Sequence, residues 1–430
     1  MKKIYNMMQI ACSFILISIL AGCVKDTGMK KTRIFTPVFK TAENVRAAIK
    51  SDKAEDIVHP GKIYVLGNYI FMNEIGRGVH IIDNANPASP VNKAFINIPG
   101  NEDIAVKGNT LYADCFTDLM VIDISDPSNV LLKNYVPGLF SDRQYVFGYA
   151  LSEYTIITDW IARDTIMDID VAEGAGIWRN GSFYTNNMVM YEDMFYSAAS
   201  YDGSKSNVIP SPVGVGGSMA RFAIMNEHLY TVTTSLLNVL NITNSSAPQW
   251  NKTIPLNNFI ETIYPFKDKL FIGSTTGVLI YDVSNPESPV QQGVFQHLQN
   301  CDPVIADDNY AYVTLHAGSA CGENLNRLEV LDIKDLSQPT LIRAYDLSNP
   351  HGLSKDGNIL FVCNGDDGLI MFDATDVYNI QRLKKIELPE TFDVICYNKI
   401  AIVSAKDGLY QYDYSNVNDV RLLSKIIIKQ

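Results

Sequence analysis

The chain has 430 residues, of which 47% are apolar, 10% aromatic and 19% charged. This composition supplies enough apolar side chains for a large folded core and excludes an intrinsically disordered chain. The formal net charge is −12. A nucleic-acid partner is therefore not expected, because phosphate binding needs a positively charged face.

The first 22 residues have the pattern of an export signal. Lys2 and Lys3 form a short positive region, and residues 10–20 are apolar apart from Ser and Cys. This stretch is too short to span a bilayer with ease. The sequence LAGC at 20–23 resembles the lipobox of bacterial lipoproteins, which implies cleavage before Cys23 and lipid attachment to Cys23. The alternatives are an uncleaved anchor and an ordinary secretory signal.

The rest of the sequence repeats with a period of about 40 residues. Each unit has three apolar segments of four to seven residues, rich in Val, Ile, Leu, Tyr and Phe and separated by turns with Gly, Asn, Asp or Pro. The third segment of each unit ends in an Asp or Asn, namely Asp83, Asp123, Asn241, Asp282, Asp332, Asp373 and Asp413. Short strands at this period, with room for a fourth, are typical of the blades of a β-propeller.

The number of blades depends on the 118 residues that separate Asp123 from Asn241. Residues 145–170 contain three apolar segments in the right order without a good Asp turn, so we interpret them as a degenerate blade, followed by an insertion at 171–216. The prediction is an all-β chain with a single β-propeller of eight four-stranded blades at 61–430. Seven blades are the alternative.

The two ends of the mature chain are predicted to close the propeller. Residues 23–60 would form a lipidated linker, with a closing strand at 33–39 that pairs near the C-terminal strand 421–428. Such closure would remove free sheet edges.

The third segments carry a family resemblance. They resemble the LVIVD repeat in LMVIDIS at 119–125, VLIYDVS at 278–284 and LEVLDIK at 328–334. The resemblance covers about 61–138 and 219–430 and is to exported bacterial propeller proteins, with 301–332 most similar to the members from Bacteroidota. It implies the propeller fold, but no activity, because the family has no established one. Asn241 departs from the usual Asp.

Polar residues are predicted to surround one mouth of the central channel. Counting back nine residues from the middle of the second strand gives a comparable position on each innermost strand, and in five blades it is polar. These residues are Glu102 or Asp103, Glu261, Asp302, His351 and Asp393, whereas two other blades have Gly61 and Ala220. Converging groups of this kind favour a cation or a polar ligand such as a polyol. The alternative is a solvated channel lining.

The spacing of the seven cysteines matches no zinc motif, and no metal or cofactor is expected. Cys115, Cys363 and Cys396 fall in predicted strands, where small buried thiols are expected. Cys301 and Cys321 are predicted to form a disulfide, because the first begins the innermost strand of a blade and the second follows its second strand. A hairpin would bring them to the same end of the blade. The alternative is two unrelated thiols.

No Ser in a Gly-x-Ser-x-Gly setting or other catalytic arrangement is recognisable. The sequence therefore favours a non-enzymatic propeller that binds a glycan or a protein and is lipid-anchored to the outer membrane, in the periplasmic or the surface leaflet. The aromatic-rich insertion at 171–216 suits glycan or peptide contacts. The alternative is a carbohydrate-active hydrolase or lyase that uses carboxylates at the channel mouth, about 5–10 Å apart.

Overall fold

The computed structural model describes residues 29–146, 149–150, 156–168, 177–179, 182–185, 199–200, 213–256, 259–296, 303–317 and 325–429. The chain folds into two compact units. The smaller unit comprises residues from 1–39 and 157–190, and the larger unit comprises residues from 40–156 and 191–430. The larger unit contains the propeller.

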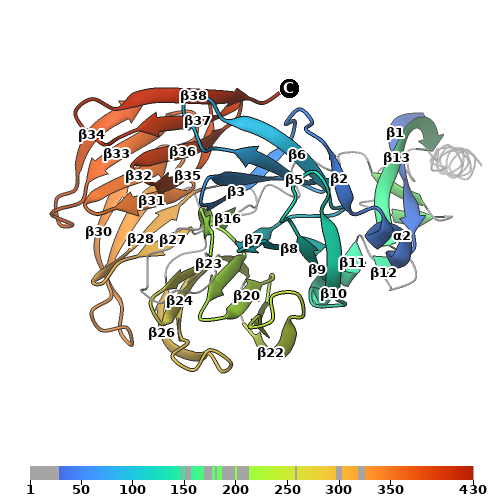
Figure 1. The fold of residues 1–430 in the computed structure, drawn as a ribbon, viewed down its shortest axis with the longest axis horizontal. Coiled ribbons are helices and arrows are strands. Elements are labelled where there is room, and N and C mark those ends of the chain that lie inside the picture. The colour runs from blue at the N-terminus through green and yellow to red at the C-terminus, as the bar shows by residue number, and fades with distance from the viewer. Residues whose placement is uncertain are drawn as a thin grey trace, which may run out of the picture. The chain divides into compact units, whose positions relative to one another are not determined.

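Seven antiparallel blades of four consecutive strands surround a common axis in the described part of the larger unit, with the first strand of each innermost (Figure 1). Blades one to three are β3 (Pro60–Leu66), β4 (Tyr69–Glu74), β5 (Gly78–Asp83) and β6 (Val91–Asn97); β7 (Ile104–Lys107), β8 (Thr110–Cys115), β9 (Asp118–Asp123) and β10 (Leu131–Val136); and β19 (Phe222–Met225), β20 (His228–Val232), β21 (Leu236–Asn241) and β22 (Gln249–Pro255).

The remaining four blades follow without a large insertion. They are β23 (Ile260–Phe266), β24 (Lys269–Ser274), β25 (Gly277–Asp282) and β26 (Val290–Gln296); β27 (Val304–Ala306), β28 (Tyr310–Leu315), β29 (Arg327–Asp332) and β30 (Thr340–Asp346); β31 (Leu353–Asp356), β32 (Ile359–Cys363), β33 (Leu369–Asp373) and β34 (Gln381–Ile386); and β35 (Thr391–Tyr397), β36 (Ile400–Ala405), β37 (Gly408–Asp413) and β38 (Arg421–Ile427).

The propeller is confirmed, but the preferred count of eight blades is wrong and the alternative of seven is right. The described residues between 145 and 170 do not form a blade. They contribute the two-stranded pair β11 (Tyr145–Val146) and β12 (Tyr149–Ala150) and the long strand β13 (Ile156–Asp168), which belongs to the sheet of the smaller unit. The physical reason is that this segment lacks the Asp turn that carries the chain from the third to the fourth strand of a blade.

That turn recurs in all seven blades. In each one, the Oδ1 atom of the predicted Asp or Asn accepts a hydrogen bond of 2.8–3.1 Å from the backbone N–H two residues later. Asn241 makes the same bond, to Thr243 at 2.9 Å. An amide oxygen therefore replaces the carboxylate there without loss of the turn.

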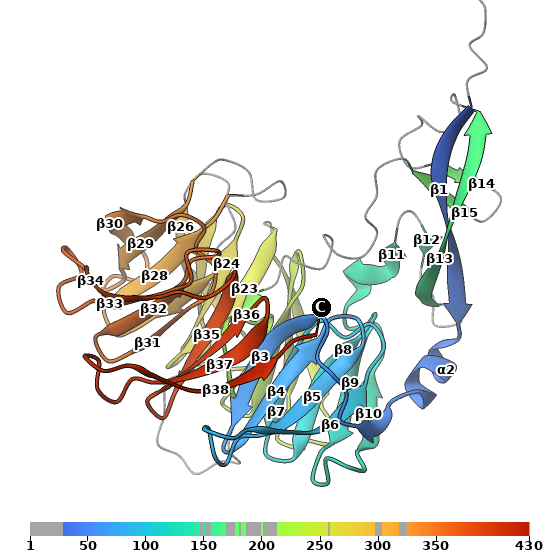
Figure 2. The same ribbon diagram turned by 90° about the horizontal axis from the view of Figure 1, so that it is seen from above.

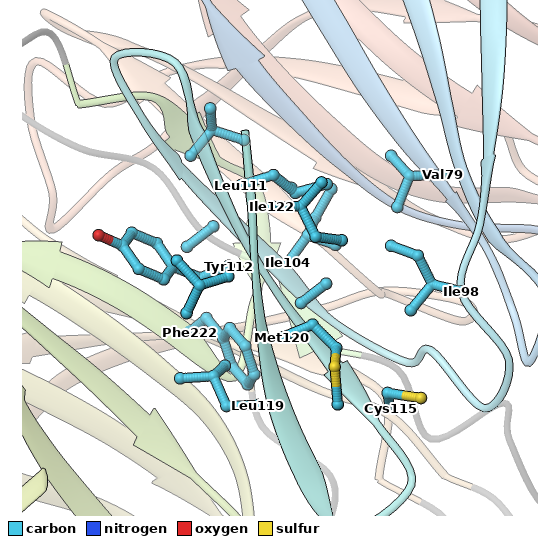
Figure 3. Close-up of a cluster of buried hydrophobic side chains, with 14 of the residues drawn as sticks. Val79, Ile98, Ile104, Leu111, Tyr112, Cys115, Leu119, Met120, Ile122 and Phe222 are labelled. Atoms are coloured by element: carbon cyan, nitrogen blue, oxygen red, sulfur yellow. The ribbon is translucent and has the colours of Figure 1, made fainter. Parts of the chain in front are cut away.

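The core lies between neighbouring blades, where apolar side chains from adjacent sheets pack together. Figure 3 shows this packing around blade two, with Leu111, Tyr112 and Met120 between Val79 of blade one and Phe222 of blade three. Cys115 and Cys363 are buried free thiols, as the sequence predicts, whereas the free thiol Cys396 is only half-buried.

Polar contacts also join neighbouring blades. In five turns between third and fourth strands, the carbonyl four residues after the Asp or Asn accepts a hydrogen bond from a hydroxyl outside its own blade. The pairs are Ser424 to Pro87, Ser51 to Pro127, Tyr112 to Ser245, Tyr230 to Pro286 and Tyr345 to Val377, at 2.6–2.9 Å. Each bond satisfies a turn carbonyl that the ladder leaves unpaired.

Residues 41–58 form a strap across blades one and two. They contain the helix α2 (Ala42–Ala47), capped by Thr41, and the strand β2 (Lys50–Lys53), which pairs with β6 and covers the outer edge of blade one. The Nη1 atom of Arg46 lies 2.8 Å from the carboxylate of Asp118, and its guanidinium stacks 4.2 Å from the ring of Tyr135. The strap thus blocks an edge that would otherwise be open to another strand.

Ring closure differs from the prediction. The closing strand expected at 33–39 lies within β1 (Met29–Lys40), which pairs with β15 (Ser182–Thr185) rather than near 421–428. No such strand is needed, because blade seven draws all its four strands from consecutive chain. Blades seven and one meet directly (Figure 2), and Ile57 and Ile428 form a parallel bridge between their segments.

The smaller unit contains a sheet with the strand order β13-β1-β15-β14, where β14 is Ile177–Arg179. Arg33 of β1 pairs with Asp164 of β13 at 2.8 Å. Among the residues described, no helix has both the length and the apolarity needed to span a membrane.

Candidate functional site

The central channel of the propeller holds a segment of the protein's own chain. Residues 213–220, which end the predicted insertion and lead into β19, contain β17 (Val215–Gly216) and β18 (Ser218–Met219). β17 pairs with the innermost strand β3, and β18 pairs with β16 (Ala199–Ser200), which lies at the centre of the propeller in Figure 1. We call residues 213–220 the channel segment.

Backbone contacts tie the channel segment to several blades. The N–H of Gly214 donates to the carbonyl of Val106 in blade two, at 2.9 Å. The N–H of Leu353 in blade six donates to the Oγ atom of buried Ser218, at 2.7 Å. A segment that bonds to opposite sides of the ring fills the channel between them.

Close packing explains why the channel segment is rich in glycine. A Cβ atom on Gly214 would lie 2.1 Å from the ring of Tyr64, and one on Gly217 would lie 2.2 Å from the carboxylate of Asp393. Both distances are far below van der Waals contact, so no larger residue fits without movement. Asp393 is therefore packed against the channel segment rather than open to a ligand in the channel.

A charged cluster lies where the innermost strands of blades one to three begin. The Nζ atom of Lys62 in β3 lies 2.5 Å from Oδ2 of Asp103, which precedes β7. The same oxygen accepts the backbone N–H of Arg221, which precedes β19, at 2.5 Å. All three blades are thus joined through one buried carboxylate.

The cluster continues outward through two arginines. Asp114 accepts hydrogen bonds from Nη1 of Arg143 at 2.7 Å and from the backbone N–H of Glu102 at 2.6 Å. Glu102 in turn lies 3.2 Å from Arg143 and 3.5 Å from Arg221. The side chains of Glu102, Arg143 and Arg221 are 25%, 16% and 15% exposed, so they form the outer surface of the cluster. We call these six residues the mouth cluster: Lys62, Glu102, Asp103, Asp114, Arg143 and Arg221.

Within the mouth cluster, burial and neighbouring charges shift the pKa values of the side chains in opposite directions. Burial lowers the pKa of Lys62, against the attraction of Asp103. Burial also raises the pKa of Asp114. For Glu102 burial would raise the pKa, but the positive charges of Arg143, Arg221 and Lys62 outweigh it and the pKa is lowered. Glu102 is therefore a carboxylate at neutral pH.

Two imidazoles meet between blades five and six. The ring centroids of His316 and His351 are 4.8 Å apart, and His351 also contacts the ring of Phe392 at 6.3 Å. Burial, helped by the charge of His316, holds the pKa of His351 at about 3, and burial lowers that of His316. Both rings are thus uncharged at neutral pH. Among the described residues, no three His, Cys, Asp or Glu side chains are grouped as a metal site would need.

Another histidine, His80, lies beside the carboxylate of Glu74. The Nε2 atom of His80 is 2.5 Å from Glu74, and Nη1 of Arg77 lies 2.5 Å from the other carboxylate oxygen. This geometry is typical of catalytic dyads, but the side chains of Glu74 and His80 are 0% exposed. A ligand does not reach them, so the pair stabilises blade one.

The structure divides the described mouth residues of the prediction among four places. Glu102 and Asp103 belong to the mouth cluster, His351 stacks on His316, and Asp393 packs on the channel segment. Glu261 lies on the innermost strand of blade four. Asp302, the lipidation residue Cys23 and the predicted disulfide pair Cys301 and Cys321 lie outside the described residues.

Lys62, Arg143 and Arg221, the basic half of the cluster, are absent from the residues predicted from the sequence. The count back of nine residues reached Gly61 and Ala220, and the charged side chains Lys62 and Arg221 come one residue later. A shift of one residue moves a side chain to the other face of a strand. One signal was available: Lys62, Asp103 and Arg221 occupy the same position in three successive repeats, and their charges alternate in sign. Arg143 follows blade two and had no repeat position to identify it.

Comparison with known proteins agrees with this architecture. A family model described as the LVIVD repeat matches residues 59–97, 101–136 and 301–347. The search of curated proteins finds no match. A protein from Lactobacillus plantarum of known crystal structure matches with a TM-score of 0.51 and 12% identity, over 93% of this chain and 97% of that one. The computationally designed protein Ika8 gives a TM-score of 0.49 and 10% identity, over 87% and 90%.

The fold and the family match define the class of protein. The chain is a seven-bladed β-propeller. It carries LVIVD repeats, and such a rigid radial scaffold fits a binding or scaffold role. The match to the Lactobacillus plantarum protein, at 12% identity, supports the fold and transfers no activity.

Proposed function

We propose that this chain is a lipoprotein of the bacterial cell envelope, anchored in the outer membrane through Cys23, and that its propeller binds a neutral polar ligand without catalysis. The ligand class is a glycan or an uncharged polar segment of a protein. The observation that carries the proposal is the mouth cluster, in which three cations and three anions are already paired with one another.

Charge balance favours a neutral ligand. A metal ion would compete with Lys62, Arg143 and Arg221, and an anion would compete with Glu102, Asp103 and Asp114. A polyol or an amide can instead add hydrogen bonds to the partly exposed guanidinium and carboxylate edges without breaking an ion pair. The outer atoms of Glu102, Arg143 and Arg221 are the expected contacts.

The same geometry supports a role without catalysis. Glycoside hydrolysis needs two carboxyl groups that both reach the substrate, one of them with a raised pKa. Asp114 has a raised pKa, but its side chain is 0% exposed. Asp103 is also buried. Glu102 is therefore the one carboxylate of this cluster that a ligand reaches.

Binding is testable with glycan and peptide arrays on the full-length chain. We expect retention of at least one glycan or uncharged peptide. Glu102→Gln is expected to weaken that binding by roughly tenfold, because a hydrogen bond to a charged group contributes about 1.5–3 kcal/mol. The measurement is the dissociation constant of the best array ligand for both proteins.

The control for this experiment is Glu387→Gln. Glu387 is exposed and pairs with Lys385 on the outer strand β34, outside the mouth cluster. This variant should bind like the unaltered chain. Silent arrays, or equal binding by the Glu102→Gln variant, would contradict the proposal.

The lipid anchor is tested separately. Cys23→Ala is expected to abolish the incorporation of labelled palmitate and to move most of the protein from the membrane to the soluble fraction. Several acyl chains are needed for stable anchoring, and all of them depend on this thiol and its amino group. Palmitate on the Cys23→Ala protein would refute the assignment.

A further inference from the structure

The strand β13 forms one edge of the sheet in the smaller unit. The strand order β13-β1-β15-β14 leaves its outer side without a partner strand among the described residues (Figure 2). At 13 residues, β13 is the longest strand of the described chain. A long unpaired edge offers a row of N–H and C=O groups to another strand.

The side chains of β13 are unusual for a protected edge. Ile161 is 61% exposed and Ile166 is 65% exposed. Asp159 and Arg163 are exposed as well, and neither forms an ion pair with a described residue. Edge strands that avoid association often carry Lys or Pro, and β13 has neither.

The side chains of β13 are arranged so that two antiparallel copies of the strand would place opposite charges against each other. Successive residues of a strand point to opposite faces, so Asp159, Ile161 and Arg163 share one face. In an antiparallel pair of two copies with Ile161 opposite itself, facing residue numbers add to 322. Asp159 then faces Arg163 of the second copy, because 159 + 163 = 322. Asp159 and Arg163 of each copy thus face the opposite charges of the other copy, on either side of the central isoleucines.

We propose that this edge is an interface between two copies of the chain, which pair through β13 in that register. The backbone ladder then spans residues 156–166 of both copies, because 156 + 166 = 322, whereas the side chain of Ile156 stays buried in the core of its own chain. Each facing pair of opposite charges or apolar side chains favours the ladder.

Neighbouring registers are less favourable. With a sum of 320 or 324, Asp159 faces Ile161 or Thr165 instead of Arg163, and with a sum of 326 the two Arg163 side chains face each other. Like charges directly opposite destabilise a pair of strands. The charges therefore select the register that centres on Ile161.

Charge reversal tests this interface. Sedimentation of the full-length chain in detergent should show a monomer–dimer equilibrium. Arg163→Asp places like charges opposite each other twice and should weaken dimerisation by at least roughly tenfold. The double change of Asp159→Arg with Arg163→Asp restores the opposite charges and should restore the dimer. Circular dichroism should be unchanged, because both residues are exposed.

The register has its own test. Ile161→Cys places two thiols opposite each other and should give a dimer band on a non-reducing gel after mild oxidation. Thr165→Cys lies on the same face but opposite Ile157, so it should give little dimer. A monomeric unaltered chain, an Arg163→Asp variant that dimerises normally, or a double variant that stays monomeric would each overturn the proposal.

Discussion

A chain that ends at Asp413 is expected to lose the cooperative unfolding of the whole propeller. The deletion removes β38, the outer strand of blade seven, together with Tyr414 and Ile428. Both side chains are buried. Burial of two such side chains contributes about 3–6 kcal/mol, which is comparable to the total stability of about 5–15 kcal/mol for a typical domain.

The deleted residues lie at the contact that closes the ring, which increases the destabilising effect of the deletion. Ile428 packs in the apolar cluster between blades seven and one and forms a bridge with Ile57. Ser424 also donates to Pro87 of blade one at 2.6 Å. The deletion therefore weakens the contact that closes the ring and exposes the edge of β37.

Thermal unfolding, followed by circular dichroism, measures this effect. The full-length chain should melt in one cooperative transition, and the truncated chain should show a broad transition at a much lower temperature. Removal of Gln430 alone is the control and should change little. A truncated chain that melts cooperatively at an unchanged temperature would show that blade seven contributes little to closure.

The second large effect is expected from Glu74→Gln. Burial by itself would raise the pKa of Glu74, but the hydrogen bonds from His80 and Arg77 outweigh it and hold the pKa at about 2, compared with its usual 4.5. That difference corresponds to about 3 kcal/mol of folding stability at neutral pH. Replacement by an amide also leaves a donor facing His80 or Arg77 in a buried site.

The pH dependence follows from the direction of this pKa. Because the folded pKa lies below the unfolded one, the ionised carboxylate stabilises the protein fully above pH 4.5, and this stabilisation is lost as the pH falls towards 2. Urea unfolding should therefore show the unaltered chain as more stable than the Glu74→Gln variant by about 3 kcal/mol at pH 7. The difference should shrink steadily below pH 4.5.

Glu55→Gln provides a matched control. Glu55 pairs with the other terminal nitrogen of Arg77, at 2.7 Å, but it is exposed. An exposed ion pair contributes at most about 1 kcal/mol, so this variant should stay close to the unaltered chain. A Glu74→Gln variant of normal stability at pH 7 would mean that the buried pair does not stabilise blade one.

The repeat could be predicted because its signals are local. The Asp or Asn at the end of each third strand bonds to a backbone N–H only two residues away, so that turn forms wherever the short motif occurs. Asn241 shows how little the motif needs, since one side-chain oxygen suffices. The same local signal is absent from residues 145–170, which lack the Asp turn and do not add an eighth blade to the described propeller.

The mouth cluster and the channel segment depended on contacts between residues far apart in the chain. Lys62 meets Asp103, and Asp103 meets Arg221 across 118 residues, and no local pattern reports such distances. The starting point of the innermost strand was also one residue off, which exchanged the two faces and gave Gly61 and Ala220 in place of Lys62 and Arg221.

By itself the sequence determined the strand repeats, the turns and the propeller, because these rest on alternating apolar residues and on side chains that bond within a few positions. Only the tertiary structure decided the seven-blade count, the closure of blade seven on blade one and the filling of the channel by residues 213–220. These features arise from packing in which a glycine, an ion pair or a bridge is favourable only once distant segments have come together.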